Sequence, residues 1–187
     1  MFSERKVAQM AAFFLDKRGG CMSHLKLMKL LYLADRESLA QFGAPISGDS
    51  PVAMPHGPVL SMTLDLMDGN VRPSQDGWDA WVTAKENYEV SLARSLLSRD
   101  ELDELSDNDI DTLSVVWDRF GQMDRWAIRD YTHDHCPEWK DPQGSSAPIG
   151  YDEIFRALGR SAEQSAELAK CIETQKALDR QFVALNA

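Results

Sequence analysis

The sequence predicts a mainly α-helical fold, a compact multi-helix domain with one small β-hairpin and a long C-terminal helix. Three observations support this prediction. Apolar residues recur at helical spacing through most of the 187 residues. Glycines and prolines separate these periodic stretches, as is typical of turns between helices. Only residues 78–93 change toward a period of two, the pattern of a half-buried strand pair.

Two helices open the chain. In the first, the apolar stripe of an amphipathic helix runs from Val7 to Leu15, and Gly19-Gly20 end it. The second is expected to begin near Ser23 and to end at Gly43. Its apolar residues cover most of the circumference, so it should be the buried central helix.

Residues 45–69 combine prolines with a third helix. Four prolines lie between 45 and 58, so at most one short edge strand, Val52 to Met54, is expected there. Pro58 suits the first position of a helix, where its missing N–H would be unpaired in any case, and Gly69 is the matching stop. Residues 78–93 then predict a hairpin that turns at Lys85-Glu86-Asn87.

The second half of the chain is predicted to be helical with one long loop. Ser98 with Glu101 and Ser106 with Asp109 have capping-box spacing, which predicts a short acidic helix and then a helix over 110–121. A further helix is expected to start near Met123, followed by a loop over 136–150 and a short helix over 151–158. Ser161 with Gln164 opens the long helix, which should end near residue 185. We expect a main domain over residues 1–155 and a helical extension over 156–187.

Composition excludes several classes of protein. Hydrophobic residues make up 43% and charged residues 27% of the chain, ordinary values for a globular domain. Three widely spaced cysteines, Cys21, Cys136 and Cys171, are expected to be reduced thiols in a cytoplasmic protein. We expect no signal peptide and no membrane span. The net charge of −10 disfavours binding to a phosphate backbone.

The charge is unevenly distributed. Residues 1–36 carry a net charge of +4, whereas residues 98–112, hereafter the acidic segment, carry −6. The acidic segment is either a solvated helix face or a surface that meets a basic protein partner. The partner interpretation rests on Asp100, Asp103, Glu104 and Asp107.

Motifs for catalysis or metal binding are weak. His133, His135 and Cys136, with Asp130 and Asp134 nearby, form the one plausible metal cluster, but no second ligand pair supports it. We therefore prefer to interpret these residues as a capped helix end with a packed histidine. No phosphate-binding loop, nucleophile elbow or dinucleotide motif is present, so we expect neither an enzyme nor a cofactor or metal.

The order of the predicted elements is similar to a winged helix, which makes a DNA-binding regulator the alternative function. However, the candidate recognition helix over 59–69 carries Asp65 and Asp68 and has no lysine or arginine. A helix that contacts base edges normally presents basic or amide side chains. We therefore expect no nucleic-acid partner.

Three ordered stretches resemble the Panacea domain, the family of SocA-like antitoxins from bacteria and their phages. They are residues 26–49, residues 52–69 with the tetrapeptide His56-Gly57-Pro58-Val59, and residues 129–139 with Thr132-His133 and Trp139. The resemblance spans roughly residues 5–155. It implies an antitoxin that neutralises a cognate toxin by direct contact, and in some members delivers the toxin to the ClpXP protease.

The residues of these motifs allow two interpretations. His56-Gly57-Pro58 could serve the architecture, with the imidazole bonded to a backbone group or to Asp35, or could contact a partner. Thr132-His133 could meet a polar cluster formed by residues of the central helix: Tyr32, Asp35 and Arg36. The motifs would then form one polar pocket, either structural or the site where the toxin docks.

Overall fold

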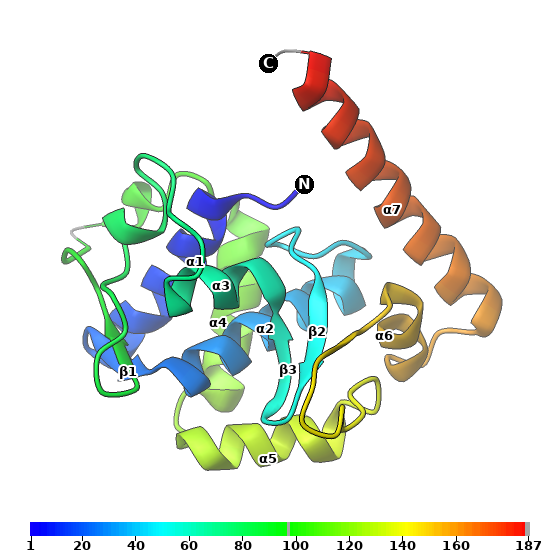
Figure 1. Ribbon diagram of the computed structural model, residues 1–187, viewed down its shortest axis with the longest axis horizontal. Helices are drawn as coiled ribbons and strands as arrows, with labels where there is room; N and C mark the ends of the chain where they lie inside the picture. Colours follow the sequence, from blue (N-terminus) through cyan, green and yellow to red (C-terminus); the bar gives the residue numbers. More distant parts are fainter. Residues whose placement is uncertain (97, 186–187) are drawn as a thin grey trace.

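The computed structural model describes residues 1–96 and 98–185 and confirms a mainly α-helical protein (Figure 1). The described residues form seven α-helices and two small antiparallel sheets. None of the described helices has the length and apolar character that a bilayer span requires.

The first two helices form as predicted. Helix α1, Glu4–Arg18, is capped at its start by the Ser3 side chain and ends at Gly19 in the left-handed conformation. Helix α2, His24–Phe42, ends in the same way at Gly43. Helix α2 contacts α1, α4, α5, α6, β1 and β3, and Figure 1 shows it in the middle of the molecule. The prediction of a buried central helix is confirmed.

The hairpin predicted for residues 78–93 is wrong in its first residues but forms farther on, where antiparallel bridges join Val82 to Leu92 and Glu86 to Glu89. The chain does reverse there, at Asn87 and Tyr88, but β4, Glu89–Ser91, pairs with β1, Cys21–Ser23, a strand that the sequence did not predict. Trp78–Ala80 forms a 3-10 turn instead of a strand. Trp78 and Trp81 are both buried. A turn brings side chains three residues apart to one side, whereas a strand would send one of them to the opposite face.

The prediction that Pro58 starts the third helix is also wrong. Pro58 lies in β3, Gly57–Leu60, which forms a hairpin with β2, Pro51–Met54. The sheet order is β3–β2–β5, where β5 is Ala147–Pro148, a two-residue strand inside the predicted loop. Strand β3 is therefore an edge strand, the place in a sheet where a residue without an N–H is tolerated.

Helix α3, Ser61–Asp68, begins three residues after Pro58 because a distant side chain caps it. The Asp49 carboxylate accepts hydrogen bonds from the backbone N–H groups of Met62 and Thr63 and from the Thr63 hydroxyl, at 2.7–3.1 Å. These are the unpaired donors of a helix start. Gly69 ends α3, as predicted.

The predicted capping boxes are present, but the first opens only a single turn. Ser98 and Glu101 frame a 3-10 turn over Arg99–Glu101, not a short acidic helix, and Leu102 and Leu105 anchor the following segment in the core. Ser106 and Asp109 cap α4, Asp107–Phe120. Asp124 caps α5, Arg125–His135.

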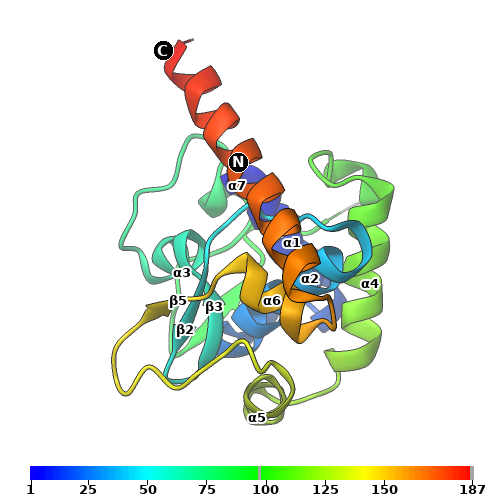
Figure 2. The same ribbon diagram turned by 90° about the vertical axis from the view of Figure 1, so that its right-hand side faces the viewer.

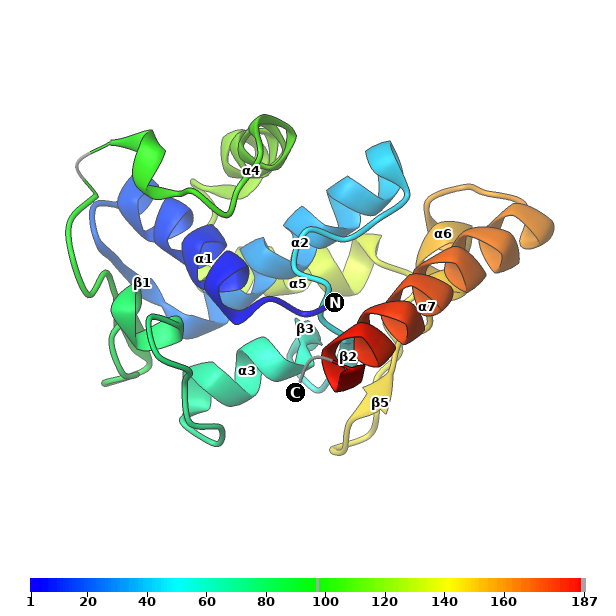
Figure 3. The ribbon, with the colours of Figure 1, turned by 90° about the horizontal axis from the view of Figure 1, so that it is seen from above.

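Helices α6, Tyr151–Ala157, and α7, Ala162–Leu185, complete the chain as predicted. They pack together around a second apolar cluster that includes Ile154, Phe155 and Ile172. Figures 2 and 3 show α7 lying across one side of the molecule, and Figures 1 and 2 show its C-terminal end projecting beyond the other helices. The predicted division at residue 155 stays a prediction.

Candidate functional site

Tyr32 and Arg36 of α2 meet at one carboxylate, that of Glu138, in the segment after α5. The Tyr32 hydroxyl and Arg36 Nε each donate to Glu138 Oε1 at 2.6 Å. We call these three residues the Glu138 cluster. Tyr32 and Glu138 are buried, and Arg36 is half-buried. Of the predicted polar cluster, Tyr32 and Arg36 therefore come together, at a residue that the sequence did not single out, whereas Asp35 is not part of this group.

The electrostatics of the Glu138 cluster favour a fixed ion pair. Burial alone would lower the pKa of Arg36, but the hydrogen bond and the charge of Glu138 outweigh burial and raise it. Burial, together with the neighbouring Glu138 charge, raises the pKa of Tyr32 well above its usual value. The guanidinium thus stays charged and the phenol stays protonated, so the cluster is a stable donor–acceptor set.

A second group of motif residues packs beside Lys29. The buried Lys29 Nζ donates to the Pro58 carbonyl at 2.7 Å, and burial lowers the Lys29 pKa to about 7. Gly57 has φ +95°, and a Cβ there would lie 2.8 Å from Thr132 Oγ1. Thr132 donates to the Arg129 carbonyl of its own helix. Gly57, Pro58 and Thr132 therefore hold the β2–β3 hairpin against α2 and α5.

His133 and Trp139 stack on each other, with ring centroids 3.9 Å apart and an interplanar angle of 3°. Trp139 Nε1 donates to the Met54 carbonyl of β2 at 2.9 Å. Burial lowers the pKa of His133, and its Nε2 has no hydrogen-bond partner within the described chain. His133 thus packs against Trp139. A shared polar pocket would require His133 to bond Tyr32 or Arg36, and the described residues contain no such bond.

Asp35 bonds to the loop after α2 and not to the Glu138 cluster. It accepts hydrogen bonds from the backbone N–H and the hydroxyl of Ser47. Burial raises its pKa to about 6, although the Ser47 hydrogen bonds oppose this rise. The suggested bond between His56 and Asp35 is wrong, because His56 is exposed at the β2–β3 turn whereas Asp35 is buried.

Asp49 connects this region to α7. Its backbone carbonyl accepts hydrogen bonds from the Tyr151 hydroxyl at 2.6 Å and from Lys176 Nζ at 3.1 Å. Its carboxylate caps α3. The loop between α2 and β2 therefore ties together α3, α6 and α7.

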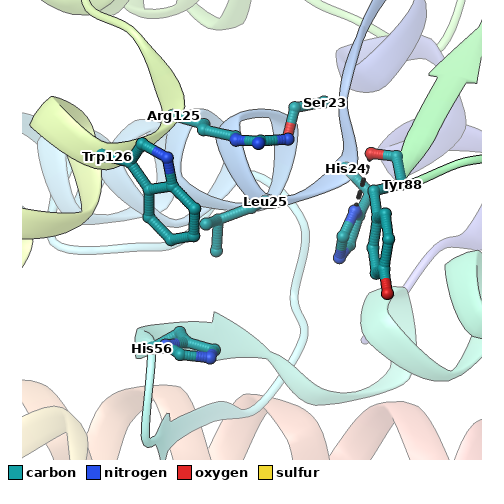
Figure 4. Close-up of a pocket in the computed structure, with 7 residues that line it drawn as sticks. All are labelled: Ser23, His24, Leu25, His56, Tyr88, Arg125 and Trp126. Carbon is teal, nitrogen blue, oxygen red and sulfur yellow. Dashed lines mark hydrogen bonds between the residues drawn. The ribbon is translucent and has the colours of Figure 1, made fainter.

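His56 lies in an exposed groove formed by segments that are distant in the sequence (Figure 4). The groove encloses a cavity of about 260 Å³ between the start of α2, the β2–β3 turn, the turn before β4 and the start of α5. We call it the aromatic groove, and its lining residues are Ser23, His24, Leu25, His56, Tyr88, Arg125 and Trp126. Of the predicted site residues, His56 alone lines it. Val59 is buried in β3.

The acidic segment is partly neutralised by the chain itself. Arg5 forms ion pairs with Asp103 and Glu104, and Lys6 pairs with Asp109 at 2.9 Å. The basic N-terminal region and the acidic segment therefore contact each other. Asp107 pairs with Arg99, and Asp100 is exposed.

The candidate metal ligands do not converge. His135 stacks on Tyr131, at a centroid distance of 4.3 Å, while His133 stacks on Trp139. Cys136 is buried, and burial raises its pKa to about 12. No group of three His, Cys, Asp or Glu residues in the described chain is arranged to hold a metal ion.

Three interior residues were missed by the sequence reasoning: Lys29, Asp49 and Glu138. All three lie inside the stretches that carry the family resemblance, so their position was a usable signal. The aromatic groove had no signal in the sequence beyond His56, because its walls come from four separate segments.

The fold and the site define a mainly helical domain with an internally bonded polar interior and an exposed groove of aromatic and basic side chains. The family model of the antitoxin SocA-like, Panacea domain matches residues 27–140. The chain belongs to this family. Searches of curated proteins and of solved structures find no significant match.

Proposed function

We propose that the protein neutralises a cognate toxin by direct protein–protein binding and is not an enzyme. The observation that carries this proposal is membership of the SocA-like antitoxin family, through a match over residues 27–140 that includes most of α2, both strands of the β2–β3 hairpin and α5.

The chemistry of the interior supports binding over catalysis. The polar side chains of the Glu138 cluster bond to one another, and Tyr32 and Glu138 are buried. The buried Cys136 thiol, with its pKa near 12, has little thiolate at neutral pH. A nucleophile needs an accessible, activated group, and these residues do not provide one.

The same proposal includes two finer features. Delivery of the bound toxin to a ClpXP-type protease in the cytoplasm is suggested by the resemblance to SocA-like proteins. Exposed carboxylates of the acidic segment, such as Asp100, are available to a basic partner surface. Complementary charges of this kind mainly accelerate association and select partners.

Coexpression tests the proposal. The product of the neighbouring reading frame is induced with and without this protein, and growth and the composition of the purified complex are measured. We expect growth rescue and a stoichiometric complex that survives size-exclusion chromatography. Failure of the wild-type protein to rescue growth or to form a complex would reject the antitoxin function.

A DNA gel shift examines the alternative, a DNA-binding regulator. Helix α3 carries Asp65 and Asp68, and Asp68 is paired with Lys85, so α3 offers no cation to a groove of DNA. We expect no shift of duplex DNA by nanomolar protein at about 150 mM salt. A specific shift under these conditions would favour the regulator.

A further inference from the structure

We propose that the aromatic groove is the surface that contacts the toxin, and that it receives a segment carrying an apolar anchor side chain beside a carboxylate. This inference rests on the proposed antitoxin function and adds the location and the chemistry of the contact.

Two large aromatic side chains at the groove are exposed to solvent. Tyr88 is 70% exposed and Trp126 is 46% exposed. Figure 4 shows both rings at the edge of the cavity, on opposite sides of Leu25. Tryptophan, tyrosine and arginine are the residues that most often dominate binding energy at protein interfaces. The groove therefore has the side chains of an interface centre, presented to solvent.

Contacts with His24 hold Tyr88 in place. Tyr88 has φ +66°, a left-handed conformation that is unfavourable for a non-glycine residue. In this position its carbonyl accepts the His24 N–H and lies 2.8 Å from His24 Nδ1. The His24 ring stacks on the Tyr88 ring at a centroid distance of 5.9 Å. The aromatic wall is therefore preorganised, which lowers the entropic cost of binding.

The charge of the groove is opposite to that of the whole chain. The chain has a net charge of −10, yet no aspartate or glutamate lines the groove. Arg125 is exposed, lies over the Trp126 ring at 5.0 Å, and forms no ion pair within the described residues. Arg129 lies over the same ring at 4.8 Å but is paired with Asp130, so Arg125 is the cation that the groove presents. The adjacent Asp124 is engaged in capping α5.

The apolar and charged side chains of the aromatic groove indicate which kind of segment binds there. The apolar floor at Leu25 and the Trp126 ring suit an apolar anchor, and the unpaired Arg125 guanidinium suits a carboxylate next to that anchor. A nucleic acid would bring many phosphates toward a chain of net charge −10, with few cations at the groove to neutralise them. A short acidic and apolar protein segment fits better.

Substitutions at the groove test the assignment. We expect Arg125→Glu and Trp126→Ala each to weaken binding to the neighbouring gene product at least tenfold, measured by surface plasmon resonance, and to impair growth rescue. Matched controls are Arg72→Glu and Phe42→Ala, exposed positions outside the groove, which should bind and rescue like wild type. Because Arg125 and Trp126 are exposed, circular dichroism should show that both groove variants fold.

Photocrosslinking tests the chemistry of the occupant. Tyr88 is replaced by p-benzoylphenylalanine, the complex is irradiated, and the crosslinked partner segment is identified by mass spectrometry. We expect a segment with a carboxylate next to an apolar side chain. A basic or uncharged segment, or a crosslink to nucleic acid, would overturn the proposed occupant.

The two proposals fail in different ways. If wild-type protein rescues growth and both groove variants bind and rescue equally well, the groove assignment is wrong and the antitoxin function stands. If wild-type protein neither binds nor rescues, the function itself is wrong, and the groove inference falls with it.

Discussion

The Glu138 cluster and the acidic segment are built from similar charged residues but differ in their access to water. The side chain of Glu138 is 0% exposed, whereas that of Asp103 is 53% exposed, although each pairs with an arginine at 2.6 Å. In the interior, removing one partner leaves the other charge buried without a counter-charge or water, which strongly destabilises the fold. At the surface, water replaces the lost partner, so the pair contributes little to stability.

This difference divides the predicted site residues into those expected to affect folding and those expected to affect binding. We expect Tyr32, Asp35, Arg36 and Thr132 to affect mainly folding, because they bond within the interior or pack there. We expect His56 and the carboxylates of the acidic segment to affect mainly binding, because they are exposed or bonded at the surface. Four predictions test the separation.

The largest effect is expected for Glu138→Ala. This change removes the acceptor of both the Tyr32 hydroxyl and the Arg36 guanidinium, and leaves the guanidinium half-buried without its counter-charge. We expect the free energy of unfolding to fall by about 3 kcal/mol. Denaturation with urea measures it, and Asp100→Ala, at an exposed carboxylate, serves as the control. Equal stability of the two variants would contradict the distinction between interior and surface.

A somewhat smaller effect is expected for Asp49→Ala, because its carboxylate caps α3 from a distant loop. We expect a loss of about 2 kcal/mol, the upper range for a lost helix cap. Hydrogen exchange should accelerate at the amides of Met62 and Thr63, which donate to Asp49. Asp65→Ala, within α3 itself, is the control. Unchanged exchange at Met62 and Thr63 would show that the cap does not stabilise the helix.

The third effect depends on pH. In the folded protein, burial raises the pKa of Asp35 to about 6, above the value of about 4 for an unfolded chain. Folded Asp35 therefore holds its proton more tightly, so its contribution to stability is complete below pH 4 and is lost as the pH rises through 6. We expect stability to fall over this window by at most about 3 kcal/mol.

Asp35→Asn is the matched variant for this measurement, because it keeps the shape of the side chain but cannot titrate. The difference in unfolding free energy between wild type and variant should change between pH 4 and 6 and should be constant from pH 7 to 8. A difference that stays constant from pH 4 to 8 would show that Asp35 titrates alike in both states.

The smallest effect on stability is expected for neutralising the acidic segment. The combined variant replaces four exposed or half-buried carboxylates: Asp100→Asn, Asp103→Asn, Glu104→Gln and Asp107→Asn. The melting temperature should barely change, whereas association with the toxin should become slower and less dependent on salt. Surface plasmon resonance at two salt concentrations measures both. Unchanged association rates would remove the acidic segment from the interface and leave the aromatic groove.

The sequence by itself determined the family and most of the helices, although not the start of α3 or the short acidic helix. Helical periodicity, the stops at Gly43 and Gly69, and the Ser106–Asp109 capping box are local signals, and the structure confirms each. These signals can be recognised in the sequence because every backbone hydrogen bond of an α-helix joins residues only four positions apart.

Only the tertiary structure decided where the strands pair and which charges meet. Pro58 lies in an edge strand and β4 pairs with β1. Glu138 accepts a hydrogen bond from Tyr32, which is 106 positions earlier in the chain. A strand pairs with another strand, and the local sequence does not specify which one. A buried charge needs a counter-charge, which the packing of distant segments supplies. The aromatic groove has the same origin, because its four walls come from separate segments that only the folded structure brings together.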